Sequence, residues 1–199
     1  MIILSEIFYI IASYLIGSFP TSAVIARLKG VNLAAEGSGN LGATNVSRVI
    51  GRKFGIITLT VDTAKGFIPV FIAIKLFPAS LILISIIIIA PVLGHCYSVF
   101  IKFKGGKGVA TGLGVFLAIS PEAVIIAFSI FLLILLFSKY VSLSSMVSAF
   151  FMPFLIFYTL KNIYIFAASS MVAILIIYKH YPNIKRLLSG TEHEIKIKK

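Results

Sequence analysis

A polar block rich in glycine, serine and asparagine interrupts an otherwise strongly hydrophobic chain and ends in a single arginine. It reads Gly37-Ser38-Gly39-Asn40-Leu41-Gly42-Ala43-Thr44-Asn45-Val46-Ser47-Arg48. Glycines let a backbone approach a ligand closely and turn successive N–H groups toward an anion. An arginine can bind a phosphate through two parallel hydrogen bonds. The block therefore predicts one wall of a phosphate-binding site, with Arg48 as a ligand.

A second polar cluster extends from Gly94 to Thr111 and includes His95 and the sequence Lys104-Gly105-Gly106-Lys107-Gly108. A helix that began at Gly105-Gly106-Lys107 would direct N–H groups and the positive end of its dipole at a phosphate. The motif is not a nucleotide P-loop, because that motif has Ser or Thr directly after its lysine. By itself it is also typical of a Gly-rich turn beside cytoplasmic lysines. The first cluster favours the phosphate-binding interpretation.

A third polar cluster runs from Lys179 to Glu192. Within it His180, near Asn183, is the best candidate for a general base, although an interfacial histidine without a role would look the same. His95 has either a structural hydrogen-bonding role or a chemical one, and we expect His193 to be solvated in a charged tail. Histidines this scattered, with few carboxylates nearby, do not indicate a metal site. We expect neither a metal nor a cofactor.

Two opposite charges, Asp62 and Lys65, lie three residues apart inside a hydrophobic segment. That spacing puts them on one face of a helix. Charges inside a membrane span are costly and usually face a bundle interior or a watery cavity. They either pair with each other as structural ions or shape the site, and the sequence leaves both alternatives open.

The composition places these polar residues in a membrane protein. Hydrophobic residues make up 59% of the chain and charged residues 12%, whereas soluble proteins are about half apolar and about a quarter charged. Several hydrophobic runs approach the roughly 20 residues that cross a bilayer as a helix. Alternating strand-like segments are missing, so we expect helices rather than an outer-membrane barrel. The single Cys96 excludes an intrachain disulfide and a cysteine-based zinc site.

We expect an all-α integral membrane protein with seven transmembrane helices in one domain, residues 1–199. The sequence Ser120-Pro121-Glu122 is typical of a helix start, with a capping serine, a proline in the first turn and an acidic residue. The expected helices span Ile2–Ala26, Phe54–Phe77, Ala79–Phe100, Val109–Ile119, Pro121–Phe137, Leu143–Leu160 and Ile163–Tyr178.

The distribution of basic residues predicts the orientation. Segments 27–53, 102–107, 139–142 and 179–199 hold 15 of the chain's 18 lysines and arginines. Because basic residues concentrate in cytoplasmic loops, we expect the N-terminus outside and the C-terminus in the cytoplasm. This arrangement puts all three polar clusters on the cytoplasmic side. It also accounts for the net charge of +12 without nucleic-acid binding.

Together the three clusters resemble the bacterial acyl-phosphate:glycerol-3-phosphate acyltransferases, the PlsY family, over essentially the whole chain. The segments that carry the resemblance are Gly37–Arg48, Gly94-His95, Phe103–Thr111, and His180 with Asn183. The resemblance implies a seven-helix enzyme of the inner (cytoplasmic) membrane with its active site on the cytoplasmic side. It would transfer a fatty acyl group from acyl phosphate to the 1-hydroxyl of sn-glycerol 3-phosphate. The products, in the first acylation of bacterial phospholipid synthesis, would be lysophosphatidic acid and phosphate.

The resemblance also implies which residues and partners are involved. The implied catalytic residues are Ser38, Arg48, Lys107, His180 and Asn183. The implied substrate-binding residues are Gly37, Asn40, Gly42, Thr44, Asn45, His95, Lys104, Gly105, Gly106, Gly108 and Thr111. The expected partners are the two substrates, the lipid bilayer and, functionally, the enzyme that makes acyl phosphate. No cofactor is implied.

An acyl phosphate is already activated, so we expect direct attack by the glycerol hydroxyl without an acyl-enzyme. The proton would go to His180 or to a substrate phosphate oxygen; we favour the phosphate because no carboxylate stands near His180 in the sequence. A transporter for an organic phosphate would use similar residues, but near the membrane midplane and with repeat symmetry. A structural lipid-binding protein would explain the basic loops but not the block from Ser38 to Arg48.

Overall fold

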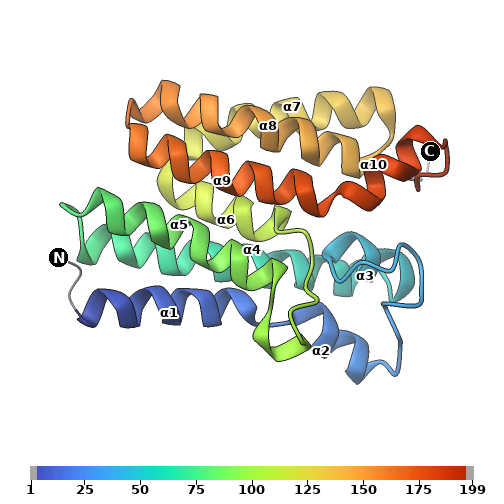
Figure 1. Ribbon diagram of the computed structural model, residues 1–199. Helices are drawn as coiled ribbons and strands as arrows, with labels where there is room; N and C mark the ends of the chain where they lie inside the picture. The colour runs from blue at the N-terminus through green and yellow to red at the C-terminus, as the bar shows by residue number, and fades with distance from the viewer. Residues whose placement is uncertain (1–3, 196–199) are drawn as a thin grey trace. The chain divides into compact units, whose positions relative to one another are not determined.

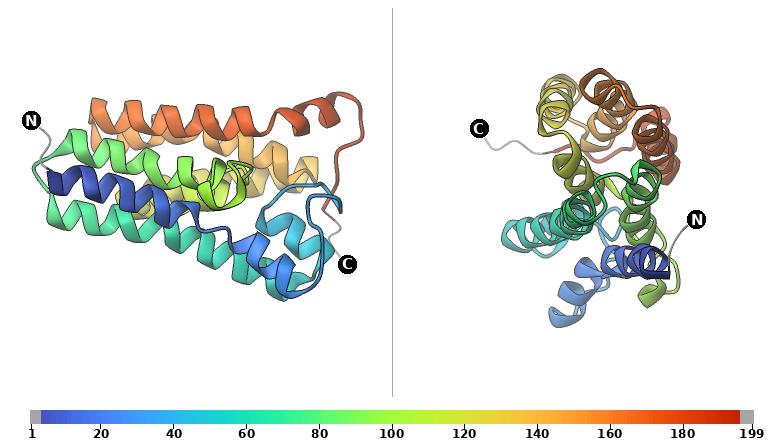
Figure 2. Two further views of the ribbon diagram at one scale, coloured as in Figure 1. Left: turned by 60° about the horizontal axis from the view of Figure 1, so that its bottom comes forward. Right: turned by 90° about the vertical axis from the view of Figure 1, so that its left-hand side faces the viewer.

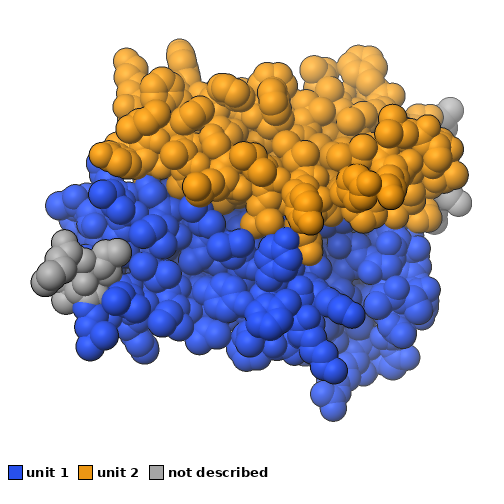
Figure 3. All heavy atoms as spheres, viewed as in Figure 1, with its two compact units in different colours: residues 1–119 blue, residues 120–199 orange. Residues whose placement is uncertain are grey.

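The computed structural model describes residues 4–195, and within this range the chain is all-helical, without a β-strand (Figure 1). The chain divides into two compact units, Met1–Ile119 and Ser120–Lys199, coloured separately in Figure 3. Every polar residue proposed above falls in one or the other unit.

From residue 4 onward, unit 1 contains four longer helices and three short ones. Its elements are α1 (Leu4–Ser18), α2 (Thr21–Leu28), α3 (Ala43–Val49), α4 (Arg52–Leu76), α5 (Leu81–Cys96), the 3₁₀ helix η1 (Val99–Ile101) and α6 (Val109–Ile119). Helices α1, α4, α5 and α6 run side by side, with α4 against α6 and α1 against α5 (Figures 1 and 2). The ends of α1 and α5 and the starts of α4 and α6 lie together, beside α2 and α3 (Figure 1).

Helix α4 is in contact with its neighbours through glycines. A Cβ atom on Gly66 would stand 2.1 Å from the carbonyl oxygen of Thr111 on α6, and one on Gly114 would stand 1.9 Å from that of Thr63 on α4. A Cβ on Gly55 would likewise meet Ser47 of α3 at 2.5 Å. Small residues of this kind let helix backbones approach closely in membranes. Helix α4 is therefore the element on which α3 and α6 are placed.

The first predicted segment, Ile2–Ala26, corresponds from Leu4 onward to one candidate membrane span, Leu4–Leu28, but it is not one continuous helix. The structure breaks it at Phe19 and Pro20, between α1 and α2. Proline has no N–H to donate and disfavours helical geometry in the residue before it. The break redirects the chain toward the first polar cluster.

Unit 2 consists of α7 (Pro121–Ser138), α8 (Val141–Leu160), α9 (Ile163–Lys179) and α10 (Tyr181–Leu188). The predicted start at Ser120 is confirmed, since the Ala123 N–H donates to the Ser120 hydroxyl at 3.3 Å. Asn162 caps α9 in the same way, accepting from two N–H groups. Helices α7 and α9 both pack against α8 (Figure 1). Helix α10 follows α9 after a bend of 52°.

Among the described residues, five helical segments are long and apolar enough to cross a membrane, and α9 with α10 gives a sixth if the bent pair counts as one span. Helix α6 has 11 residues, about 16 Å of helix against a hydrocarbon core of about 30 Å. Its boundaries match the predicted fourth segment. The count of seven and the orientation of the termini stay predictions. Exposed apolar side chains such as Phe8, Ile125 and Phe137 suit a helical protein surrounded by lipid.

The other predicted helices differ from the observed ones by at most four residues at either end, and their bounds at Pro121, Leu160 and Ile163 coincide. Larger corrections concern the polar clusters. Helix α3 lies inside the first cluster and α10 inside the third, although neither was predicted. A helix starting at Gly105 is wrong, because α6 begins at Val109. The stretch before it instead folds back on the end of α5.

Candidate functional site

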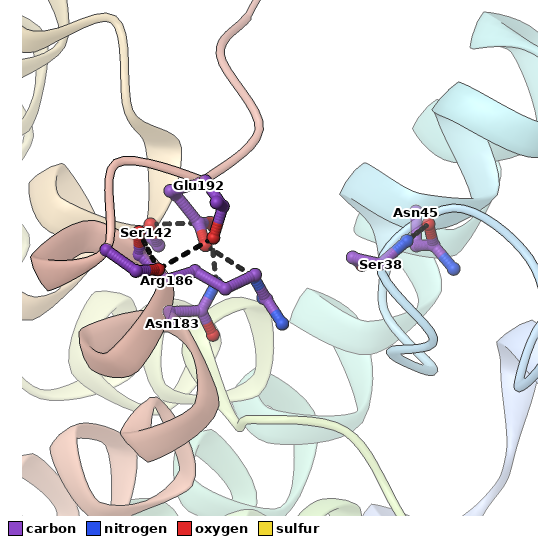
Figure 4. A network of polar contacts seen from close by, with 8 residues as sticks. Ser38, Asn45, Ser142, Asn183, Arg186 and Glu192 are labelled. Atoms are coloured by element: carbon purple, nitrogen blue, oxygen red, sulfur yellow. Dashed lines mark hydrogen bonds and ion pairs between the residues drawn. The ribbon is translucent and has the colours of Figure 1, made fainter.

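The first polar cluster is shaped by Asn45, which lies on α3 and is 1% exposed. Its side-chain oxygen accepts from the Ser38 N–H at 2.9 Å (Figure 4). Its side-chain nitrogen donates to the carbonyls of Leu33, at 3.3 Å, and Glu36, at 3.1 Å. Gly37 has a φ of +60°, and a Cβ there would stand 2.3 Å from the Asn45 oxygen. Asn45 thus fixes the loop that presents Ser38, rather than facing a ligand itself.

Helix α3 also positions Arg48. Thr44 and Arg48 are both exposed and lie four residues apart, so they share one face of the helix. A guanidinium at this place can bind an anion that approaches the first cluster. Because α3 is held on α4 by the close contact of Ser47 with Gly55, Arg48 projects from a fixed element.

The second cluster turns back under the end of α5. The Gly105 N–H donates to the Cys96 carbonyl and the Gly106 N–H to the His95 carbonyl, both at 3.2 Å. These two amides are engaged within the protein, so the expectation that they would point at a phosphate is wrong. A Cβ on Gly106 would stand 2.3 Å from His95 Nε2 and 2.7 Å from the Leu41 carbonyl oxygen. Glycine is required there because the first and second clusters meet at this residue.

Helix α6 starts directly after this turn. Gly108 has a φ of +84°, and its carbonyl accepts from the Gly112 N–H at 2.7 Å. The positive end of the α6 dipole therefore lies at Gly108 and Val109, next to the half-buried Lys107. An anion that approached this end of α6 would meet Lys107 and the first turn of the helix, rather than the amides of Gly105 and Gly106.

Asp62 and Lys65 form the ion pair that their spacing allowed, with Lys65 Nζ 2.8 Å from Asp62 Oδ1. They are 2% and 6% exposed. A cavity of about 10 Å³, about the size needed for one water molecule, adjoins them and is also lined by Leu41, His95 and Gly106. The pair therefore lies beneath the point where the first two clusters meet.

In unit 2, His180 is 3% exposed and stands between α9 and α10. Its Nδ1 lies 2.7 Å from the Ile176 carbonyl oxygen. A carbonyl can only accept, so Nδ1 carries a proton in this contact. If the ring is neutral, Nε2 is then the nitrogen that could accept a proton.

Asn183, on α10, belongs to a network around the carboxylate of Glu192 (Figure 4). Glu192 Oε1 accepts from Asn183 Nδ2 at 2.7 Å and from the Ser142 hydroxyl at 2.9 Å. Glu192 Oε2 accepts from Arg186 Nε at 2.7 Å. Burial alone would raise the pKa of Glu192, but the bonds from Arg186, Asn183 and Ser142 and the Arg186 charge outweigh it and lower that pKa. Glu192 thus orients Asn183 and anchors the tail after α10.

No role was predicted for Glu192, Ser142, Arg186 or Thr21. Ser142 and Glu192 are 50 residues apart, and no local pattern joins them. The available signal was weak: Glu192 is one of only six acidic residues in the chain and stands inside a polar cluster. Such isolated acids in a basic segment are natural partners for an arginine.

The candidate residues differ in exposure. Of the catalytic set, Arg48 is exposed, Ser38 and Lys107 are half-buried, and His180 and Asn183 are buried. Of the substrate-binding set, Gly37, Thr44 and Lys104 are exposed; Asn40, Gly42 and Gly105 are half-buried; Asn45, His95, Gly106, Gly108 and Thr111 are buried. The buried members support the site through neighbours; the Thr111 carbonyl, for example, faces Gly66. His180 and Asn183 belong to unit 2 and all the others to unit 1.

These features define a multi-pass, all-helical integral membrane protein whose polar residues gather at helix ends. A family model described as glycerol-3-phosphate acyltransferase matches residues 7–190. The chain belongs to this family, which confirms the resemblance seen in the sequence.

Relatives and solved structures agree with this assignment. The chain is 46% identical over 192 residues to the glycerol-3-phosphate acyltransferase of Syntrophotalea carbinolica, covering 95% of this chain and 98% of the relative. It is 45% identical to that of Aquifex aeolicus, covering 96% and 99%. It is 44% identical to PlsY (YgiH), an integral membrane glycerol 3-phosphate acyltransferase, in its glycerol 3-phosphate form, with a TM-score of 0.93 over 96% of both chains. The lysophosphatidic acid form of PlsY gives a TM-score of 0.90 at 43% identity, again over 96% of both chains.

Proposed function

We propose that this protein transfers a fatty acyl group from acyl phosphate to the 1-hydroxyl of sn-glycerol 3-phosphate, giving lysophosphatidic acid and phosphate. The observation that carries the proposal is the likeness, at a TM-score of 0.93 and 44% identity, to PlsY in its glycerol 3-phosphate form. The choice of acyl phosphate as donor rests on the resemblance of the three polar clusters. The enzyme that makes acyl phosphate is then its functional partner.

In this proposal two anionic substrates are held by positive and hydrogen-bonding groups. Arg48 and Lys107 bind phosphate oxygens, with Ser38 and Asn183 as further donors. Glu192 accepts from the side-chain nitrogen of Asn183 and so orients this amide. The remaining substrate-binding residues either lie beside these cations and donors or hold them in place through backbone contacts. We propose that residues 1–199 act as one transmembrane acyltransferase domain, as the resemblance implies.

The reaction needs no covalent intermediate. The glycerol 1-hydroxyl oxygen attacks the acyl carbonyl carbon, and the bond from that carbon to the phosphate oxygen breaks. Phosphate leaves with the electron pair, and the hydroxyl proton passes to a phosphate oxygen or to His180 Nε2. Holding both substrates close together in the reactive orientation lowers the barrier by up to about 7–11 kcal/mol. The cations stabilise charge on the departing phosphate.

The decisive assay uses purified full-length protein with glycerol 3-phosphate and either palmitoyl phosphate or palmitoyl-CoA. We expect lysophosphatidic acid and phosphate from palmitoyl phosphate only. Arg48→Ala and Lys107→Ala are expected to lower kcat/KM roughly 100-fold or more, the usual cost of removing a group that stabilises developing charge. Arg52→Ala and Lys53→Ala are matched controls, because both are exposed cations at the start of α4. Turnover with palmitoyl-CoA, or equal loss in the controls, would contradict the proposal.

One further variant distinguishes the two proton acceptors. If a phosphate oxygen takes the proton, His180→Gln keeps most of kcat, since glutamine can still hydrogen-bond near Ile176. If His180 is the base, the same variant loses about 100-fold or more of kcat, and the remaining activity no longer rises with pH near the histidine pKa. The pH profile of kcat decides between them.

We propose further that the site faces the cytoplasm in the inner membrane.

A further inference from the structure

The buried ion pair of α4 has partners on two other parts of unit 1. Besides Lys65, Asp62 Oδ1 accepts from the Thr21 hydroxyl at 2.9 Å. Besides Asp62, Lys65 Nζ donates to the Phe19 carbonyl at 2.9 Å. Phe19 and Thr21 stand on either side of Pro20, where α1 ends and α2 begins. The pair therefore holds the corner from which the chain continues into the first polar cluster.

The same pair faces the second polar cluster. His95 Nδ1 lies 3.9 Å from Asp62 Oδ1, and the His95 carbonyl accepts the Gly106 N–H. Gly106 in turn touches the Leu41 carbonyl of the first cluster. Tyr14 and Ser98 tie α1 to the same turn, since the Tyr14 hydroxyl donates to the Tyr97 carbonyl and the Ser98 hydroxyl to the Ser18 carbonyl.

These bonds have a directional role that packing alone does not supply. A buried ion pair can often be replaced by apolar residues of similar volume without loss of stability. Apolar side chains, however, cannot donate to the Phe19 carbonyl or accept from the Thr21 hydroxyl. The charges therefore specify directly where the corner stands relative to α4. The turn is linked to them through the contact of His95 with Asp62 and through the bond from Ser98 to Ser18.

We propose that Asp62 and Lys65 are a positioning pair for the phosphate-binding residues. They hold the Phe19–Thr21 corner and the Cys96–Lys107 turn against α4. The first cluster and Lys107 therefore keep fixed positions relative to each other. Neither residue contacts substrate. The kinetic part of this inference rests on the proposed function, whereas its structural part does not.

The central experiment replaces both charges at once, in Asp62→Leu with Lys65→Met. Lys65→Met alone leaves an unpaired buried carboxylate, so we expect little folded protein from it. The double variant leaves no buried charge, and we expect its thermal unfolding in detergent to return close to that of the unmodified protein. Hydrogen–deuterium exchange of the peptide 96–107 should nevertheless be about tenfold faster or more. The KM for glycerol 3-phosphate should rise about tenfold to a hundredfold, with a smaller change in kcat.

Two milder comparisons keep the test decisive if the double variant folds poorly. Thr21→Ser keeps the hydroxyl that donates to Asp62 and should behave as the unmodified protein. Thr21→Val removes it and should raise both the exchange rate of the 96–107 peptide and the KM. Thr58→Val is the matched control, because Thr58 is fully buried on α4 and bonds only to the Phe54 carbonyl of its own helix.

The outcomes separate the two proposals. Unchanged exchange of the 96–107 peptide in a stable double variant, or in Thr21→Val, would overturn the positioning role. An unchanged KM together with faster exchange would also overturn it, because the turn would then move without affecting binding. If the unmodified protein shows no glycerol 3-phosphate-dependent turnover, the proposed function fails, and the exchange measurement still decides whether the pair orders the turn.

Discussion

At the scale of single residues, the Glu192 carboxylate is the group on which the segment after α10 depends. Its side chain is 6% exposed and accepts three hydrogen bonds, from Ser142, Asn183 and Arg186. The lowered pKa of Glu192 means that its ionised form is stabilised on folding, despite its burial. Bonds to a charged group contribute about 1.5–3 kcal/mol each when removed singly.

We expect Glu192→Gln to destabilise the protein by about 1–3 kcal/mol at neutral pH. The usual pKa of glutamate here is 4.5, and the folded value is lower. The carboxylate therefore contributes its full stability above about pH 4.5 and loses it as the pH falls through the folded pKa. Thermal unfolding of both proteins in detergent, measured over a pH series, should show a constant difference at neutral pH that shrinks below about pH 4.5.

Glu194→Gln is the matched control, since Glu194 is exposed two residues further along. It should follow the unmodified protein throughout. A difference for Glu192→Gln that does not shrink in acid would show that the carboxylate charge is not the stabilising feature. If Asn183 binds phosphate as proposed, Glu192→Gln should also raise the KM for glycerol 3-phosphate.

At the scale of elements, the contact of α4 with α6 places Lys107 and the start of α6. Gly114 stands where any Cβ would be 1.9 Å from a backbone oxygen of α4, and that oxygen cannot turn aside as a side chain could. Inside an ordinary helix, glycine to alanine stabilises by about 1 kcal/mol. At Gly114 we expect the same substitution to destabilise the protein instead.

We predict that Gly114→Ala destabilises the protein by about 1–3 kcal/mol or more, as overpacking does, and lowers activity by moving α6. Thermal unfolding measures the predicted loss of stability, and the KM for glycerol 3-phosphate measures the predicted effect on activity. Leu59→Ala serves as control because Leu59 is exposed on α4, where a smaller side chain should cost less. Stabilisation by Gly114→Ala would contradict the close contact.

The sequence was sufficient to predict the elements whose signals are local. The apolar runs and the Ser120-Pro121 start predict α4 to α9 within a few residues. The spacing of Asp62 and Lys65 allowed their pairing, which the structure confirms. Helix α3 was missed because it is seven residues long and has no apolar period. Helix α10 was missed although Pro182, in its first turn, is a usual sign of a helix start.

Other features depend on contacts between distant residues and leave no local pattern. Lys65 reaches a carbonyl 46 residues away, and Asp62 accepts from a hydroxyl 41 residues away. Gly105 and Gly106 looked like phosphate ligands because glycine suits both a ligand contact and a tight turn. Only the hydrogen bonds to Cys96 and His95 distinguish the two uses. Residue types alone therefore could not assign the backbone partners of Gly105 and Gly106.

At the scale of the whole molecule, the number of crossings decides which side each polar cluster faces. Within residues 4–195, five helical segments are long enough to cross on their own, whereas α6, with 11 residues, is not. If α6 crosses with the help of the preceding turn, and the bent pair of α9 and α10 counts as one span, seven crossings result. The two ends of α6 then lie on opposite sides of the membrane. A re-entrant α6 would leave both ends on the same side.

Single cysteines in a Cys96→Ala background should settle this point, labelled with a membrane-impermeant maleimide in intact cells and after permeabilisation. We predict that cysteines at Ala79 and Glu122 are labelled in intact cells, and that cysteines at Glu36 and Ser189 are labelled only after permeabilisation. All four positions are exposed. Labelling of the Glu122 position only after permeabilisation would show that α6 does not cross. Labelling of the Glu36 position in intact cells would put the first cluster outside. An outward-facing first cluster would be separated from any substrate held in the cytoplasm, and the proposed reaction could not occur there.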